Sequence, residues 1–448
     1  MKKYPLGSLT KMMAMSNLGS KTVEDQASMN LGFTMDLQGE LDIKKLERAI
    51  CKLVAEKIMS TYLVMEDANI WAIEKDGISF ELDVEQVEGS TIDEKKNEIK
   101  KDTERLTQVP LKLNDKNESP YIFKLYKISD EYHVLFMLVH HTFLDFGAVM
   151  IAISHVFEYY KDEQYEYPKS SEFSDYMNKE LEFMASDAAK LEDEYWANET
   201  KDIRQPKLKE DNHSETDPAI SEIELMAVFN REELNAIAAR EKTSLFNFTM
   251  LLIHMAIAKI NDCNDTILQY AISNRSEVEY RFTLGCLTRV LFNRITFEDD
   301  MKPSELNKYM RKKLGAGYQN RHVAGKTPFG AVSYLAVNED MGDLDTFPTF
   351  NGKLVKVDIV DLPRKLDFMA ALVMPLDEDN IVVGVLTDVE KYGKQAKQLV
   401  GAIKLAKKFL VEYPDKTFFD FMRQDVSLET IDLLANENTV EIIEMQRK

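Results

Sequence analysis

The stretch that decides the fold is His133-Val134-Leu135-Phe136-Met137-Leu138-Val139-His140-His141-Thr142-Phe143-Leu144-Asp145-Phe146-Gly147. Its first seven residues form a nearly continuous apolar run, which is typical of a strand buried on both faces. Residues 121–127, before it, alternate apolar and polar side chains, and Ser129-Asp130-Glu131 supplies turn residues, so we expect a hairpin. After it, residues 148–158 repeat apolar side chains at helical spacing. The two histidines therefore lie where a buried strand leads into a helix.

Helices and strands are interspersed along the rest of the chain. We predict helices at residues 41–57, 173–196, 231–241, 245–259, 304–318 and 395–411, and strands at residues 267–272, 284–297 and 381–387. No Gly-rich phosphate loop follows a strand, so a dinucleotide-binding domain is not expected. The pattern predicts a mixed α/β fold. Polar connectors at residues 161–169 and 207–217 divide it into an N-terminal lobe, residues 1–170, and a C-terminal lobe, residues 171–448.

Composition narrows the class of protein. The 448 residues, 44% of them hydrophobic, are enough to bury a large core. A formal net charge of −21 opposes binding to nucleic acid or to anionic membranes. We find no transmembrane segment or signal peptide and expect a cytoplasmic protein. Cys51, Cys263 and Cys286 are odd in number and far apart, which favours reduced thiols.

The adjacent histidines are the first candidates for chemistry. Successive side chains of a strand point to opposite faces, so His140 and His141 cannot both reach one cleft. One is expected to be structural, while the other could accept a proton from an attacking amine or alcohol near neutral pH. Alternatively, both are core histidines and Asp145 only caps the following helix. His141 and Asp145 alone are too few ligands for a metal, so none is expected.

Further motifs, in the same order along the chain, give these residues a family context. Together with His140-His141-Thr142-Phe143-Leu144-Asp145, the sequence resembles the condensation domains of nonribosomal peptide synthetases, whose histidine motif is HHxxxDG. The other matching segments are Ser174-Asp175-Tyr176, Tyr195-Trp196, Ser273-Asn274-Arg275, Leu284-Gly285-Cys286 and Lys365-Leu366-Asp367-Phe368. The resemblance extends over nearly the whole chain.

This resemblance implies two chloramphenicol-acetyltransferase-like lobes arranged as a V around a central tunnel. Two phosphopantetheine arms would enter it, one with an acyl or peptidyl thioester and one with an amine. By the same likeness, His141 is the active-site imidazole and His140 is structural. Asp145 would pair with Arg275 and brace the loop, because a charge-assisted pair fixes orientation. The chain itself would bind no cofactor, since carrier proteins supply the phosphopantetheine.

Two departures from the family pattern concern the tunnel. Phe146 stands where the motif has Gly, and Gly147 follows one place later. A bulky side chain there resists close backbone approach, so the loop is expected to be reshaped or the tunnel narrowed. Arg289 stands where the family has a neutral amide. It would pair with an anionic substrate group, or alternatively point to solvent or pair with an acidic neighbour.

The expected function is therefore amide or ester formation between a carrier-bound thioester and an acceptor. Two alternatives remain: acyl transfer from coenzyme A to oxygen or nitrogen, and a non-catalytic condensation-like docking protein. The late Asp-Phe-Gly-Trp-Gly motif of related acetyltransferases is absent, which disfavours the first. We expect acyl or peptidyl carrier proteins as partners, a monomer, and either a free-standing enzyme or an excised domain.

Overall fold

The computed structural model describes residues 2–67, 69–75, 79–203, 207–211, 226–323, 332–338, 348–360, 368–375 and 379–424. The chain divides into two compact units. Unit 1 contains Met1–Ser186, Ser273–Thr288 and Asp343–Pro363, and unit 2 contains Asp187–Ile272, Arg289–Gly342 and Arg364–Lys448. The chain thus leaves unit 1 after Ser186 and returns to it twice. A lobe boundary between residues 170 and 171 stays a prediction.

Unit 1 is built mainly from the N-terminal elements. They are β1 (Lys3–Pro5), α1 (Ser8–Leu18), α2 (Val23–Ala27), β2 (Asn30–Gln38), α3 (Ile43–Val54), β3 (Thr61–Glu66), β4 (Asn69–Glu74), β5 (Asp83–Gln86), α4 (Ile92–Thr107), β6 (Tyr121–Ser129), β7 (Tyr132–His140), α5 (Phe146–Lys161) and α6 (Phe173–Met184). The two returning segments add η2 (Val278–Tyr280), a 3-10 helix, and β12 (Thr349–Phe350), β13 (Lys353–Leu354) and β14 (Val357–Ile359).

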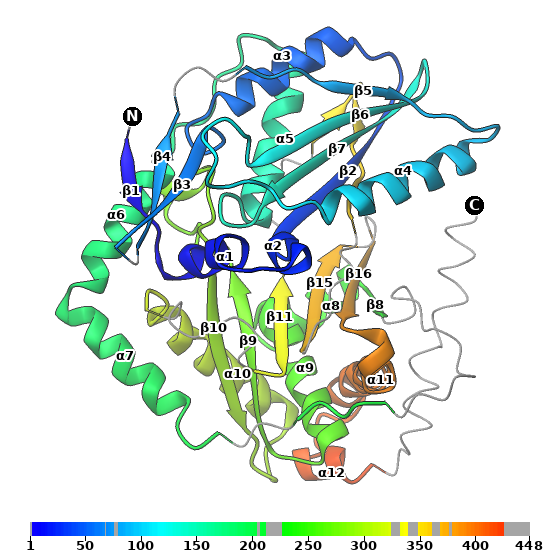
Figure 1. Cartoon of the computed structure of the whole chain (residues 1–448). Coiled ribbons are helices and arrows are strands. Elements are labelled where there is room, and N and C mark those ends of the chain that lie inside the picture. The colour runs from blue at the N-terminus through cyan, green and yellow to red at the C-terminus, as the bar shows by residue number, and fades with distance from the viewer. Residues whose placement is uncertain are drawn as a thin grey trace. The chain divides into compact units, whose positions relative to one another are not determined.

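The predicted hairpin lies at the centre of unit 1. Strands β6 and β7 pair antiparallel within a five-stranded sheet of order β14-β2-β7-β6-β5, drawn in the upper part of Figure 1. Strand β2 pairs with β7 along its whole length, so that Asn30 lies opposite His140 and Gln38 opposite Tyr132. Every residue from His133 to His140 is buried, as expected for a strand covered on both faces. The hairpin and the buried strand are confirmed.

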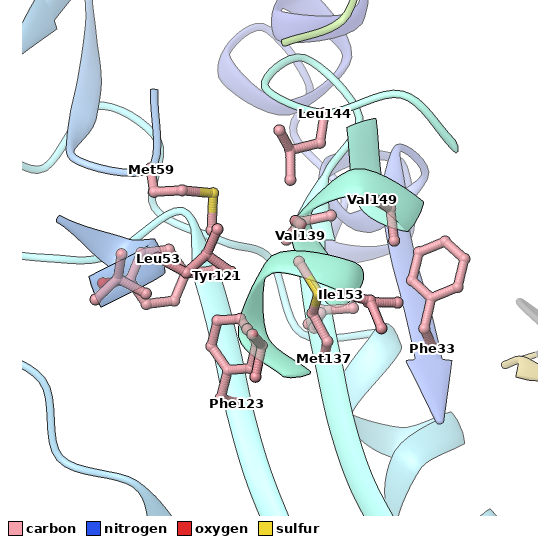
Figure 2. Packing of buried hydrophobic residues seen from close by; sticks show 14 of the residues in the cluster. Phe33, Leu53, Met59, Tyr121, Phe123, Met137, Val139, Leu144, Val149 and Ile153 are labelled. Atoms are coloured by element: carbon pink, nitrogen blue, oxygen red, sulfur yellow. The ribbon is translucent and has the colours of Figure 1, made fainter. Parts of the chain in front are cut away.

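Helix α5 covers one face of this sheet. Figure 2 shows Val149 and Ile153 of α5 beside Met137 and Val139 of β7, with Phe33 of β2 close by. These side chains belong to a buried apolar cluster, and burying each of them stabilises the fold by about 1.5–3 kcal/mol. The start of α5, which follows the histidines after a short loop, is therefore held by the core of unit 1.

Unit 2 surrounds a second sheet. Its elements are α7 (Asp187–Glu199), β8 (Met226–Asn230), α8 (Arg231–Arg240), α9 (Leu245–Asn261), β9 (Asp265–Ile272), β10 (Arg289–Thr296), α10 (Pro303–Gln319), β11 (Tyr334–Asn338), β15 (Met369–Pro375), β16 (Asn380–Leu386), α11 (Val389–Glu412) and α12 (Phe418–Met422). The six strands have the order β10-β9-β11-β15-β16-β8, and β11 runs parallel to both of its neighbours (Figure 1). The mixed α/β class is confirmed.

Most predicted elements lie where the sequence indicates, with two differences. The helix expected over residues 173–196 is two helices, α6 and α7, because the chain turns at Ala185 and Ser186, where no Gly or Pro marks a break. The strand expected from Leu284 begins only at Arg289. The amides of Leu287 and Thr288 donate to the Asp145 carboxylate and are therefore not available to a sheet. Residues 212–217 of the second connector lie outside the described residues.

Within the described part of the chain, no single helix is long and apolar enough to cross a membrane. Helices α8 and α9 together have the length and apolar composition of a membrane span, but the pair is bent by 92° between the two helices. Most of α9 is buried in the core of unit 2, as its residues from Phe248 to Ala258 show.

A buried histidine of unit 2 predicts acid sensitivity. The Nδ1 atom of His254 lies 2.7 Å from Oγ1 of Thr266, and burial lowers the pKa of His254 from 6.5 to about 3. Because the pKa of His254 is lower in the folded state than in the unfolded state, its contribution to stability is complete above pH 6.5. This contribution is lost as the pH falls toward 3, by about 1.4 kcal/mol per pH unit.

We expect His254→Gln to lose less stability than the native protein between about pH 7 and about pH 4.5, measured by thermal unfolding. Equal acid losses in the native and His254→Gln proteins would contradict this prediction.

Candidate active site

The two histidines have different surroundings at the end of β7. The side chain of His140 is fully buried, and its Nδ1 atom accepts a hydrogen bond of 3.2 Å from the amide of Thr142. His141 is only half-buried, and its backbone amide donates to the carbonyl of Met29 at 2.8 Å. Strand β7 ends at His140, and His141 is the first residue of the turn that follows, so the two side chains have different surroundings. This difference in burial agrees with one structural and one available histidine.

Asp145 has the densest set of polar contacts at this junction. It is the N-cap of α5, where its Oδ1 atom accepts from the amide of Ala148 at 2.8 Å. Its Oδ2 atom accepts from the guanidinium of Arg275 at 2.9 Å, from the amides of Leu287 and Thr288 at 2.8 and 3.0 Å, and from the Thr288 hydroxyl at 3.1 Å. Asp145 therefore forms the ion pair with Arg275 that the family resemblance implied, and it also caps α5, which was the alternative role expected from the sequence.

Electrostatics keep this carboxylate ionised. Burial by itself opposes the charged form of Asp145, but the positive charge and hydrogen bond of Arg275 and the amide of Ala148 outweigh it. The pKa of Asp145 therefore lies below its ordinary value. The side chains of Asp145 and Arg275 are only 2% and 7% exposed, so solvent screens their attraction weakly.

Arg275, which lies in the segment of residues 273–288, connects this segment to Asp145 in the loop between β7 and α5. Its Nη2 atom donates to the carbonyl of Gly285 at 2.8 Å. Gly285 in turn packs so closely against the ring of Phe173 that a Cβ atom there would lie 2.2 Å from Phe173 Cδ2. The neighbouring Asn274 has a left-handed backbone with φ of 53° and donates to the hydroxyl of Tyr176 at 2.7 Å. Residues 273–288 are therefore fixed against α6 and against the loop after β7.

Phe146 and Gly147 form the first turn of α5. Phe146 has no positive φ angle and packs against Phe33, with ring centroids 6.1 Å apart. A Cβ atom at Gly147 would lie 3.2 Å from Nη1 of Arg275, so the small residue provides room for the guanidinium. That these two residues line a substrate tunnel stays a prediction.

Arg289 lies in unit 2 at the first position of β10, opposite Ile272 of β9. It is only 4% exposed, so the alternative that placed this residue in solvent is wrong. Its contact with an anionic substrate group stays a prediction.

Cys286 was not assigned a role by sequence reasoning. Its sulfur lies 3.9 Å from Nδ1 of His141, within hydrogen-bonding reach for sulfur. The Leu284-Gly285-Cys286 segment is visible in the sequence, but the 144 residues between Cys286 and His141 give no local signal of the contact. Among the described residues, no group of three or more His, Cys, Asp or Glu side chains could hold a metal ion. Of the later Lys365-Leu366-Asp367-Phe368 segment, the first three residues lie outside the described residues.

Comparisons with known proteins identify the family. The family model described as "Condensation domain" matches residues 9–345, which is more than half of the chain. The chain therefore belongs to the condensation-domain family. Condensation domains of nonribosomal peptide synthetases are acyltransferases that form amide bonds between substrates held on carrier proteins, with phosphopantetheine as the attachment.

Individual relatives agree with this assignment. The chain is 24% identical to Surfactin synthase subunit 1 of Bacillus subtilis over 298 residues, which is 64% of this chain and 8% of that synthetase. The condensation domain of the Monacolin K polyketide synthase MokA matches with a TM-score of 0.74 at 14% identity, covering 93% of this chain and 99% of that domain. The first condensation domain of the calcium-dependent antibiotic synthetase matches equally, with a TM-score of 0.74 at 13% identity, covering 94% and 99%. The fold is that of condensation domains, while the chain spans between 2% and 12% of the length of the curated synthetases it matches.

Proposed function

We propose that this chain joins an acyl or peptidyl thioester on one carrier protein to an amine held by a second carrier protein. The observation that carries the proposal is the placement of His141: half-buried at the end of a buried strand, next to an N-cap carboxylate that is ion-paired to Arg275. This constellation belongs to a chain of the condensation-domain family, which supports amide formation as its reaction.

In this proposal, His141 is the catalytic residue. The amine nitrogen attacks the thioester carbonyl carbon, the carbon–sulfur bond breaks, and the phosphopantetheine thiol leaves. The amine loses one proton, which the His141 imidazole accepts and the departing sulfur finally receives, so the step balances without a further reactant. An ester would form in the same way from a hydroxyl acceptor. His140, Asp145 and Arg275 are structural residues that fix the position of this imidazole.

Phosphopantetheine arrives with the substrates, so the chain needs no cofactor of its own. Acyl and peptidyl carrier proteins are the proposed donors and acceptors. The net charge of −21 makes nucleic acid and anionic membranes poor partners, and it also weakens long-range attraction to an acidic carrier protein. We therefore propose brief encounters governed by local contacts, with the chain acting as a monomer in the cytoplasm.

The donor distinguishes this proposal from its alternatives. An acyltransferase that uses coenzyme A would need groups for its phosphates, and the sequence has no Gly-rich phosphate loop. The experiment offers a panel of aminoacyl and fatty-acyl groups on holo-carrier protein, on coenzyme A and on pantetheine, each with the same amine acceptor. We expect kcat/KM to be highest for the carrier-bound donor.

Other outcomes of this comparison have defined meanings. A higher kcat/KM with coenzyme A would replace the condensation reaction by acyl transfer from a soluble donor. Binding of the carrier protein without transfer from any donor would indicate a non-catalytic docking protein. The bulk of Phe146 at the loop motivates that second alternative.

A further inference from the structure

We infer that Cys286 is a positioning residue for His141, which fixes the protonated ring nitrogen and the orientation of the imidazole. The inference rests on the proposed function for its meaning in catalysis, but the contact itself is a property of unit 1. No step of the reaction proposed above uses Cys286.

The contact brings together two segments that are far apart in sequence. Sγ of Cys286 lies 3.9 Å from Nδ1 of His141, and both residues belong to unit 1. The side chain of Cys286 is fully buried, whereas that of His141 is half-buried. The sulfur therefore contacts the imidazole from the protein side, on the nitrogen nearer to the backbone.

The backbone around Cys286 is fixed on both sides. Before it, the carbonyl of Gly285 accepts a hydrogen bond of 2.8 Å from the guanidinium of Arg275. After it, the amides of Leu287 and Thr288 donate to Asp145 at 2.8 and 3.0 Å. The backbone of Gly285 also packs closely against the ring of Phe173, which leaves no room for a side chain there. Asp145, which caps α5, and its ion-pair partner Arg275 thus also hold the thiol in place.

The chemistry of the pair determines what this contact does. A neutral imidazole carries one proton, and the hydrogen bond made by one ring nitrogen decides which nitrogen carries it. A thiol is a weak donor, and its sulfur is a weak acceptor. In the proposed arrangement, Nδ1–H donates to the Cys286 sulfur, and Nε2 is then the nitrogen that accepts a proton from the attacking amine. Cys286 therefore favours the tautomer that a base requires, and it does not itself touch the substrate.

The tautomer can be measured without any substrate. Labelling histidine with ¹⁵N and comparing native protein with His141→Ala identifies the two ring signals of His141. We expect the native protein at neutral pH to carry the proton on Nδ1, and we expect Cys286→Ala to shift the ring signals toward a mixture of tautomers. Cys286→Ser, which retains a polar atom at this place, should remain closer to native. Cys51→Ala is the control, because this half-buried thiol of α3 contacts the carbonyl of Phe80 instead.

Turnover gives the second readout. Cys286→Ala is expected to lower kcat by about tenfold with little change in KM, and to displace the acidic limb of the pH–kcat profile, since it perturbs the base and not substrate binding. Cys286→Ser should recover most of this loss. A native ring protonated mainly on Nε2, or Cys286→Ala with native ring signals and a native pH profile, would overturn the inference. If His141→Ala remains fully active, His141 is not the catalytic residue of the proposed reaction, while the ring signals still decide whether Cys286 sets the tautomer.

Discussion

Replacing His141 by alanine is expected to lower turnover by about a hundredfold or more and to leave the fold intact. The expected size is that of losing a positioned acid–base group. The side chain is half-buried, so its removal leaves less empty volume than a fully buried residue would. The measurement is kcat for amide formation from a carrier-bound donor, together with the unfolding midpoint of the same preparation.

His140→Ala is the matched control for this prediction. Its side chain is fully buried and accepts from the amide of Thr142, so its loss should lower the melting temperature and affect turnover mainly through the fold. Native turnover in His141→Ala would remove this residue from the mechanism. A larger loss of turnover in a folded His140→Ala than in His141→Ala would reverse the two assignments.

The second large effect concerns the buried pair of Asp145 and Arg275. Removing either charge leaves the other uncompensated, which should destabilise unit 1 by about 3–5 kcal/mol. Asp145→Asn carries a further penalty, because the carboxylate accepts from five donors and an amide has only one oxygen to offer. Because the pKa of Asp145 is lowered in the folded state, its contribution is present near neutral pH and is lost as the pH falls through that folded pKa.

A double-mutant cycle with Asp145→Asn and Arg275→Gln tests this pair by denaturant unfolding. We expect the double variant to be clearly more stable than the sum of the two single losses implies. Lys179→Gln is the control, since its ion pair with Glu279 lies in the same unit but is exposed, so solvent screens it and its loss should destabilise the protein far less. Additive losses at Asp145 and Arg275 would mean that the two charges do not stabilise each other.

The strand and helix around the histidines could be predicted because their signals are local. An unbroken apolar run, turn residues before it and a helical repeat after it describe β7 and α5 without reference to the rest of the chain. The caps are local as well: Asp145 lies three residues before the amide that it accepts from, as an N-cap should. The pairing of Asp145 with Arg275 was predicted only from the resemblance to the family.

The remaining features depend on contacts between distant segments. The late start of β10 follows from the carboxylate of Asp145, which takes two amides that a sheet would otherwise use. The Cys286 contact depends on the same arrangement, which no periodicity in the sequence encodes. The return of residues 273–288 and 343–363 to unit 1 is equally non-local, because a strand such as β14 is recognised only by its partner β2.

The central claim, amide formation between two carrier-bound substrates, can be tested by the intact masses of both carrier proteins after incubation with this chain. The donor carrier is loaded with an acyl group and the acceptor carrier with an amino acid. The account predicts that the acceptor gains the mass of the acyl group while the donor returns to free holo-carrier, and that His141→Ala slows both changes together by about a hundredfold. Loss of the acyl group from the donor with no gain on the acceptor, or equal rates with and without the chain, would contradict it.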